Sequence, residues 1–356
     1  MPTISPPTRF ETLIVRRAST WPIVTPQSPV PLSPWQAASL LQKAIRRGDV
    51  ERTQQAVWSL LSTDPVRMWR RLGVIAFEDI GLANLPLVGQ VLVALRGKTL
   101  RRSLGGEMRV AIGIATDLAL SPKNRSADDL LCVLNSHPDI PHVARKFAGM
   151  SAQRLLYAVS GDLSVTEASV AARKFAINCN SSPSYVPTEL LNSLGVGPSV
   201  EWLAQEGGKR TRTMLPLLVA LLSRANGLKQ ENPDDEFPEG IEIAGQPGWA
   251  LDMFTREGKA AIRRLMAGSS EVARFARDTF PYAGRAQLLG EAVFRVESGL
   301  LRNRQDGPLG QALRSQMERE CLGIDPGHAD KLLSLMTAAI PELNDCRREI
   351  IGRVEQ

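Results

Sequence analysis

The stretch DPVRMWRRLGVIAFEDIGLAN, residues 64–84, carries the start, the body and the end of one amphipathic helix. Asp64 is a helix-capping residue type, and Pro65 after it suits the first helical position. The apolar residues that follow recur at the spacing of one helical face. The run ends at Gly81, and glycine is the residue type that most often ends a helix. The stretch therefore predicts a helix that packs one face inward and stops at Gly81.

Two adjacent acids, Glu78 and Asp79, occupy the last turn of this predicted helix. The helix macrodipole favours cations at that end, so the acids need positive partners from another segment. We expect Lys123 and Arg125, in the loop SPKNR, to be those partners. We interpret Glu78, Asp79 and Gly81 as a structural motif that locks a turn between helices or a contact between subunits. Adjacent helical side chains point about 100° apart, which disfavours chelation of one metal ion by this pair.

Similar helix signals continue on both sides of this stretch. Ser33-Pro34, Asp49 and Pro86 mark helix starts, and Gly48 marks a helix end. Aromatic residues make up only 5% of the chain and β-branched runs are short, which favours helices over strands. Short loops between amphipathic helices are typical of compact bundles. We therefore expect an all-α protein, a helical bundle followed by a further helical region.

Composition divides the chain into five parts. Residues 1–33 are rich in Pro, Ser and Thr and predict a flexible arm that docks its apolar side chains on a partner or a neighbouring subunit. The segment 226–248 is acidic and contains three prolines and four glycines, which predicts a linker or loop. Helical regions are expected over 34–140, 141–225 and 249–356. No internal repeat is evident.

Several classes of function lack their sequence signals. The segments RGKT and GGKRT, at 96–99 and 207–211, do not have the glycine and Lys-Ser/Thr spacing of a phosphate-binding loop. No Gly-x-Ser-x-Gly motif and no zinc-like Cys/His spacing occurs, so neither a catalytic residue nor a metal or other cofactor is predicted. No apolar run is long enough for a membrane span. The four scattered cysteines are typical of reduced thiols, and we expect a cytoplasmic protein.

Positive charge is concentrated in the first folded third of the chain. Residues 34–135 contain 14 Lys and Arg against nine Asp and Glu, while the whole chain has a net charge of +6. Such a face suits a polyanion, although it also occurs as a merely solvated surface. Basic residues at helix ends contact phosphates without reading bases, and the interleaved aromatic residues of a single-strand stacking platform are missing. We therefore expect duplex or backbone binding rather than base readout. The candidate DNA-contacting residues are Arg46, Arg47, Arg70, Arg71, Lys98, Arg101, Arg102, Lys123 and Arg125.

The segment LLQKAIRRGDVERTQQAVWSLLSTDPVRMWRRLGVIAFEDIGLANLPL resembles the C-terminal helical region of the RarA/MgsA proteins, which are AAA+ relatives of clamp loaders. The similarity rests on Gln42-Lys43-x-Ile45-Arg46, on Arg70-Arg71-Leu72 and on the run 78–83, and it covers roughly residues 36–135. The family's Pro-Lys-Ser-Asn loop is altered here to PKNRS. The family's ATPase module is not expected, because no Walker motif occurs and 35 residues stand upstream. The resemblance implies a clamp-loader-collar type of bundle that oligomerises in proteins of replication and recombination.

Three functions are consistent with these patterns. The first is a non-catalytic, oligomerising, DNA-associated accessory protein of replication, repair or recombination, in a cell or a mobile element. It would act alone or with a separate AAA+ ATPase or replication protein. The second is a protein-interaction scaffold without DNA binding, whose basic face contacts an acidic partner. The third is an enzyme with a site in residues 141–356, where ALDMFTREGKAAIRRL concentrates charges that also suit helical pairs such as Asp252–Arg256.

Overall fold

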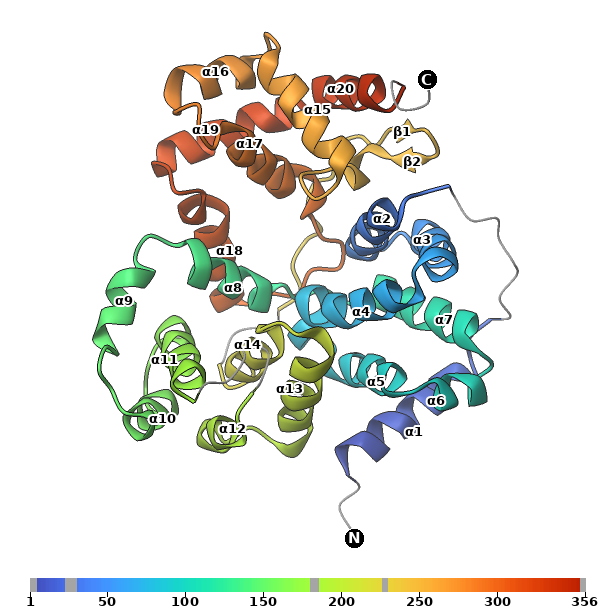
Figure 1. The fold of residues 1–356 in the computed structure, drawn as a ribbon, viewed down its shortest axis with the longest axis vertical. Helices are drawn as coiled ribbons and strands as arrows, with labels where there is room; N and C mark the ends of the chain where they lie inside the picture. The colour runs from blue at the N-terminus through green and yellow to red at the C-terminus, as the bar shows by residue number, and fades with distance from the viewer. Residues whose placement is uncertain (1–4, 23–30, 180–185, 226–229, 353–356) are drawn as a thin grey trace.

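The computed structural model describes residues 5–22, 31–179, 186–225 and 230–352. Nearly all regular structure in these residues is helical, with one short β-hairpin (Figure 1). The predicted all-α class is confirmed. The helices form a larger lower lobe and a smaller upper lobe of C-terminal helices (Figure 1). No helix in the described part of the chain is both long and apolar enough to cross a membrane.

The lower lobe contains the helices up to α14, a π-helical turn η1 and a 3₁₀ turn η2. These elements are α1 (Pro6–Ala18), α2 (Pro34–Arg47), α3 (Val50–Thr63), α4 (Pro65–Ile75), η1 (Ala76–Ile80), η2 (Gly81–Ala83), α5 (Leu85–Arg96), α6 (Lys98–Ser103), α7 (Glu107–Leu120), α8 (Ser126–Ser136), α9 (Ile140–Lys146), α10 (Ala152–Ser160), α11 (Val165–Asn178), α12 (Thr188–Leu194), α13 (Pro198–Thr211) and α14 (Leu215–Leu222).

The upper lobe follows a two-stranded antiparallel hairpin, and one of the C-terminal helices, α18, returns to pack on α8 of the lower lobe (Figure 1). The elements are β1 (Glu242–Ile243), β2 (Gln246–Pro247), η3 (Gly248–Ala250), α15 (Arg256–Ala267), α16 (Glu271–Thr279), α17 (Arg285–Val293), a second π-helical turn η4 (Phe294–Ser298), α18 (Pro308–Arg319), η5 (Glu320–Leu322), α19 (Pro326–Ala338) and α20 (Ile340–Gly352).

The predicted helix starts around α4 are confirmed. The side chains of Ser33, Asp49 and Asp64 each accept a hydrogen bond from the backbone N–H three residues later, at 2.9–3.3 Å. Such caps satisfy N–H groups that have no partner inside the helix. They set the entry of α2, α3 and α4, the three helices that lead to the Glu78–Asp79 motif.

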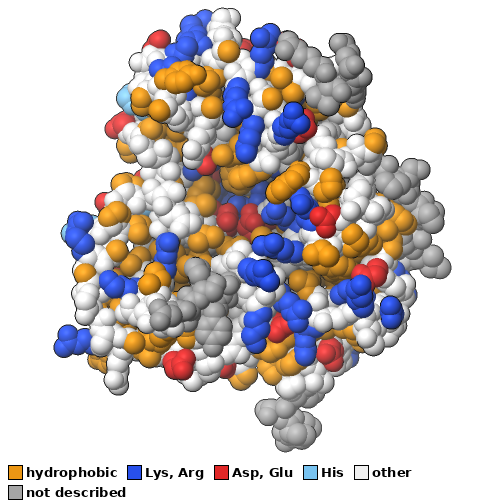
Figure 2. All heavy atoms as spheres, viewed as in Figure 1, with side chains coloured by type: hydrophobic (Ala, Val, Ile, Leu, Met, Phe, Trp, Pro, Cys, Tyr) orange, Lys and Arg blue, Asp and Glu red, His pale blue; other side chains and the backbone are white. Residues whose placement is uncertain are grey.

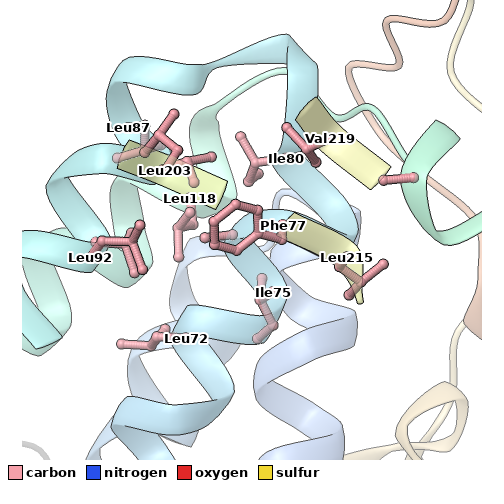
Figure 3. Close-up of a cluster of buried hydrophobic side chains, with 14 of the residues drawn as sticks. Leu72, Ile75, Phe77, Ile80, Leu87, Leu92, Leu118, Leu203, Leu215 and Val219 are labelled. Carbon is pink, nitrogen blue, oxygen red and sulfur yellow. The ribbon is translucent and has the colours of Figure 1, made fainter. Parts of the chain in front are cut away.

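One apolar core continues from α1 to α14, across the boundary expected at residue 140. Phe77 lies at the centre of a cluster of side chains from α4, α5, α7, α13 and α14 (Figure 3). Gly207 in α13 permits this approach, because a Cβ there would lie only 2.4 Å from Phe77 Cζ. The upper lobe has an apolar core of its own, built from α15, α16, α17, α19 and α20.

The flexible arm predicted over residues 1–33 is wrong for its first half. Residues 6–18 form α1, which packs on α5 and α13 of the same chain rather than on a partner. Phe10 fills the space over Gly89, and Trp21 fills the space over Gly113. The regular spacing of buried apolar residues along α1 outweighs its high proline content, because proline is tolerated in the first helical turn. Residues 23–30 of the predicted arm lie outside the described residues.

Of the acidic segment expected as a linker or loop over 226–248, residues 230–248 are described, and they contact the C-terminal part of the chain. Asp235 accepts hydrogen bonds from Leu301 N–H and from Arg304 Nη2, at 2.8 and 2.6 Å. Asp234 accepts one from Asn303 N–H at 2.6 Å. Its acidic side chains therefore hold the chain between the two lobes, and the segment then turns through the hairpin into α15.

Two stretches of the chain share an order of elements, although no internal repeat was evident in the sequence. A first unit, residues 34–81, runs α2–α3–α4 into η1, and a second unit, residues 256–299, runs α15–α16–α17 into η4. Both π-helical turns stop immediately before a glycine. Too few residues match for the sequence pattern to stand out. The residues that recur 217 positions later include Ile45, Arg46, Arg47, Leu72, Gly73 and Phe77, as Ile262, Arg263, Arg264, Leu289, Gly290 and Phe294.

Candidate nucleic-acid interface

The Glu78–Asp79 pair lies in the π-helical turn η1 and not in a plain α-helical end. The turn stops at Gly81, whose φ of +44° is a conformation that L side chains rarely adopt. A Cβ at Gly81 would also lie 2.9 Å from the carbonyl oxygen of Asn124. Glycine therefore lets the loop that contains Arg125 approach the acids directly.

Two arginines from separate segments neutralise the acidic pair. Arg46 Nε lies 2.7 Å from Asp79 Oδ1, and Arg46 Nη2 lies 2.6 Å from Glu78 Oε1. Arg125 Nη1 contacts both carboxylates, at 2.5 Å and 3.4 Å. Burial by itself would raise the pKa of Asp79, but the two guanidinium groups outweigh it and lower that pKa. The expectation that Arg125 supports the pair is confirmed, and Arg46 is a partner that the sequence did not reveal.

Lys123 has a different role from the one expected. Its buried ammonium group donates to the carbonyl oxygens of Ala119 and Ser121 rather than to the acids. Burial lowers the pKa of Lys123 to about 8. Its backbone also joins the two parts of the chain, because Lys123 N–H donates to Asn303 O and Gln305 N–H donates to Lys123 O. Lys123 is therefore a structural link at the contact between the lobes.

The contact between the lobes, here called the interlobe seam, is lined by polar groups. Lys43 Nζ lies 3.0 Å from Asp252 Oδ1, with both side chains buried, and it also donates to Ser39 Oγ. Burial lowers the pKa of Lys43, although the attraction to Asp252 opposes the shift. The helical pair expected between Asp252 and Arg256 is replaced by this long-range pair, because Asp252 precedes α15 and points into the seam. Asp252, one residue of the cluster considered for an enzyme, thus makes a structural contact.

The nine candidate DNA-contacting residues separate into two groups. Arg46, Arg101, Lys123 and Arg125 are buried, and their cationic groups bind carboxylates or backbone carbonyls. Arg47 is half-buried between the rings of Phe237 and Trp249, and it donates to Glu297 O at 2.9 Å. Burial lowers the pKa of Arg47 to about 10. These five residues hold the fold together, so their assignment to a DNA-contacting face is wrong. Those that remain accessible are Arg70, Arg71, Lys98 and Arg102.

A groove of about 490 Å³ carries Arg70 and Arg71 on α4. Trp35, at the start of α2, forms part of its wall and is 64% exposed. The guanidinium group of Arg67 lies 4.2 Å from the centre of the Trp35 ring. Within the described residues, neither Arg70 nor Arg71 has a carboxylate at salt-bridge distance, so their positive charge is uncompensated. We call this surface the basic groove.

The basic groove continues over the ends of neighbouring helices. Thr211, the last residue of α13, and Thr213, which follows it, also line the groove, and Arg212 between them is exposed. Gly73 lets these helix ends close on α4, because a Cβ there would lie 3.0 Å from Leu95 and 3.6 Å from Thr211. Figure 2 shows Lys and Arg side chains gathered over α4 and α13. The exposed cations Lys98, Arg102, Lys209 and Arg210 lie on α6 and on the last turn of α13.

A second hollow, the interlobe cleft, adjoins the basic groove and has a volume of about 340 Å³. The two share Trp35, Ala38 and Arg71 as lining residues. Figure 2 shows acidic side chains within a hollow between the lobes. Glu78 and Asp128 both line the interlobe cleft. Burial raises the pKa of Asp128 to about 7, although the adjacent Arg125 opposes the rise.

Searches against models of known protein families, curated proteins and solved structures found no match to this chain. The function is therefore inferred from the geometry of the chain itself. In the described part of the chain, no group of three or more His, Cys, Asp or Glu side chains is arranged to hold a metal ion.

Sequence reasoning missed the residues that make the groove distinctive. Trp35 follows Ser33-Pro34 and falls outside the apolar stripe of α2, which was a usable signal for an exposed aromatic. Arg67 also lies off the apolar face of α4, but its stacking on Trp35 joins helices 32 positions apart. Thr211 and Thr213 gave no signal, because only the packing of α13 on α4 brings them to the groove.

Proposed function

We propose that the protein is a non-catalytic accessory protein that holds single-stranded DNA along the basic groove. The observation that carries this proposal is the uncompensated pair Arg70 and Arg71 beside the exposed, arginine-stacked ring of Trp35. Guanidinium groups supply phosphate contacts, and an exposed aromatic ring supplies a surface on which a base stacks. An accessible ring favours a single strand over a duplex, whose bases are already stacked.

The resemblance of residues 36–135 to the RarA/MgsA C-terminal region extends this proposal. It suggests a clamp-loader-collar type of bundle that forms homo-oligomers in DNA replication, repair or recombination. In that setting the chain acts as a DNA-holding subunit, alone or beside a separate AAA+ ATPase or replication protein. Light scattering after size-exclusion chromatography measures the oligomer directly. A strictly monomeric protein at all concentrations would remove the oligomerisation part of the proposal.

The test of DNA binding is fluorescence anisotropy with a labelled oligothymidylate at several salt concentrations. Phosphate contacts release counterions, so the logarithm of the association constant should fall linearly with the logarithm of salt concentration. The double variant Arg70→Ala/Arg71→Ala should weaken binding and reduce the salt slope by about 0.7 for each arginine that contacts a phosphate of the single strand.

A matched control is Lys259→Ala/Arg263→Ala, which removes two exposed cations from α15 in the upper lobe. Both double variants lower the net charge by the same amount. Binding should therefore be retained in the control and weakened in the groove variant. Equal losses in the two variants would show a general charge effect and no DNA site at the groove. No binding by the unaltered protein would refute the proposal outright.

A second candidate function, a protein-interaction scaffold, has one specific observation in its favour. A groove of about 610 Å³ lies between the segment 236–241 and α20, with apolar walls that include Phe237 and Ile340. Glu236 and Glu239 at this groove are exposed and have no ion pair within the described residues. Such a surface suits a partner segment with apolar and basic residues. Binding of one protein partner without any affinity for DNA would favour this scaffold function.

A further inference from the structure

The interlobe cleft is placed where a strand in the basic groove would reach it. Trp35 and Arg71 line both hollows, so the boundary between them is formed by an exposed ring and a guanidinium group. The cleft volume of about 340 Å³ falls within the range of small-molecule sites, and it accommodates one nucleobase with part of its sugar. A base turned away from the strand at Trp35 therefore has a defined space to enter.

The cleft has aromatic surface on its upper-lobe side. Phe254 is 61% exposed, and its ring meets the ring of Phe294 edge to face, with centroids 5.9 Å apart and planes at 88°. Both rings line the cleft. An exposed ring held in place by a second ring offers a preformed face on which a base can stack. Such base–aromatic stacking contributes to the free energy of binding.

The lower-lobe side of the cleft presents hydrogen-bond acceptors. Glu78 and Asp128 line it, with side chains 15% and 17% exposed. Their ion pairs with Arg46 and Arg125 use Glu78 Oε1 and Asp128 Oδ2, and the guanidinium groups fix the orientation of both carboxylates from behind. Each carboxylate retains a second oxygen that can accept hydrogen bonds. A partly exposed, oriented carboxylate is suited to a ligand edge with adjacent N–H donors.

We propose that the interlobe cleft receives one base of the bound strand and prefers guanine. This inference rests on the proposed function, because the strand must first occupy the basic groove. Guanine presents two adjacent donors, N1–H and the N2 amino group. The free oxygen of Glu78 or Asp128, together with a remaining lone pair on its arginine-paired oxygen, can accept both. Thymine presents a single N–H between two carbonyl oxygens, and those oxygens would face the carboxylate unfavourably. Stacking on Phe254 adds affinity for any base, whereas Glu78 or Asp128 supplies the discrimination.

The experiment uses the full chain and oligothymidylates that carry one central substitution: guanine, adenine, cytosine or an abasic site. Fluorescence anisotropy should show the guanine oligomer binding at least about tenfold tighter than the unsubstituted oligomer, as expected for one bidentate base contact. The abasic oligomer should be the weakest. Equal affinities for the guanine, thymine and abasic oligomers would overturn the inference, while a salt-dependent affinity shared by all of them would leave the proposed function standing.

Two variants separate the parts of the cleft. Asp128→Asn removes one carboxylate, replaces an acceptor oxygen by a donor amide and should reduce the guanine preference severalfold. Phe254→Ala should weaken binding of every oligomer that has a central base and should not affect the abasic one. Tyr282→Ala is the control, because Tyr282 is also a solvent-exposed aromatic residue, at 79% against 61% for Phe254, but lies outside the cleft. A guanine preference unchanged in both cleft variants would overturn the inference.

A measurement on the unaltered protein guards against misfolding of the variants. Guanosine monophosphate should displace the guanine oligomer at lower concentration than thymidine monophosphate does. Equal displacement by the two nucleotides would overturn the preference for guanine. If no oligomer binds at all, the proposed function fails, and that outcome is distinct from binding without base preference.

Discussion

The two π-helical turns, η1 in the first unit and η4 in the second, have the same local design in different surroundings. Each follows an amphipathic helix, stops before a glycine and carries a buried acid, Asp79 or Glu297. Asp79 is held by Arg46 and Arg125, both from the lower lobe. Glu297 is held at two points by Arg347 of α20, at 2.9 and 2.6 Å. In both turns a guanidinium group distant in sequence makes the buried carboxylate tolerable.

The arginine pairs that correspond in the two units differ in their surroundings. Arg46 Nη1 donates to Ser298 O at 3.3 Å and Arg47 Nη2 donates to Glu297 O at 2.9 Å, so the second unit covers this pair. Arg263 and Arg264, at the corresponding positions, are exposed on α15. One sequence pattern therefore forms a buried seam in the first unit and an open surface in the second. The docking of the lobes, rather than the residue types, determines which arginines are available to a ligand.

The largest expected effect comes from removing the acid of each turn. Asp79→Ala should destabilise the protein by about 3–5 kcal/mol, because it removes a buried carboxylate from two buried guanidinium groups, which then keep only Glu78 and Asp128 as acidic partners. Glu297→Ala should cost less, since it affects one guanidinium group, that of Arg347, which loses its carboxylate partner but keeps Leu251 O and Asn344. Urea unfolding measures both. If Asp79→Ala lowers the free energy of unfolding no more than Glu297→Ala does, the buried acid contributes no more to stability in η1 than in η4.

The next effect concerns the buried ammonium group of Lys123, in the loop that links the two lobes. The pKa of Lys123 is about 8 in the folded state and near 10.4 when unfolded, so the unfolded chain binds the proton more strongly between these values. The stability of the unaltered protein should therefore rise with pH across that window, by up to about 3 kcal/mol from this group. Lys123→Met should lack this rise. Unfolding at pH 7, 9 and 10.5 tests it, and parallel pH profiles would contradict the assignment.

The two stop glycines should respond differently to alanine. Gly81 has φ +44°, whereas Gly299 has φ −90°, which any residue adopts. Gly81→Ala meets both backbone strain and the carbonyl oxygen of Asn124 and should cost about 2–3 kcal/mol. Gly299→Ala meets crowding from Phe294 alone and should cost about 1–2 kcal/mol. Thermal melting of both variants measures the difference, and a reversed order would show that strain at Gly81 is absent.

The smallest effect is expected at the exposed arginine pair of the second unit. Arg264 pairs with Glu349, but both side chains are about half exposed, so water and salt weaken the attraction. Arg263→Ala/Arg264→Ala should change the free energy of unfolding by less than about 1 kcal/mol. A larger loss would mean that the second unit also buries its arginine pair in the folded protein, for example against another copy of the chain.

Much of the local structure was predictable from the sequence. The starts of α2, α3 and α4 follow from Ser33, Asp49 and Asp64, and the stop at Gly81 was also expected. Local signals suffice there, because a cap or a positive φ depends on a few neighbouring residues. The partner Arg125 was also predictable, since a buried acid requires a cation. The π-helical form of the turn was not predictable, because the apolar spacing of the stretch fits an ordinary α-helix equally well.

The candidate site was predictable only in part. Of the nine basic residues proposed as phosphate contacts, five are taken up by the core or the interlobe seam. Burial of a guanidinium group depends on which carboxylate or carbonyl reaches it, and those partners come from up to 252 positions away, as with Arg46 and Ser298. The exposed Trp35 and its stacking on Arg67 likewise depend on how two helices cross.

The sequence by itself determined the all-helical class, the ends of the central helices and the need for a cation beside Glu78 and Asp79. These follow from short-range geometry and from the cost of burying an unpaired charge. Only the tertiary structure decided which arginines are structural, that α1 docks on its own chain and that the basic groove meets the interlobe cleft at Trp35. Those outcomes depend on contacts between segments far apart in the chain, and residue spacing carries no information about such contacts.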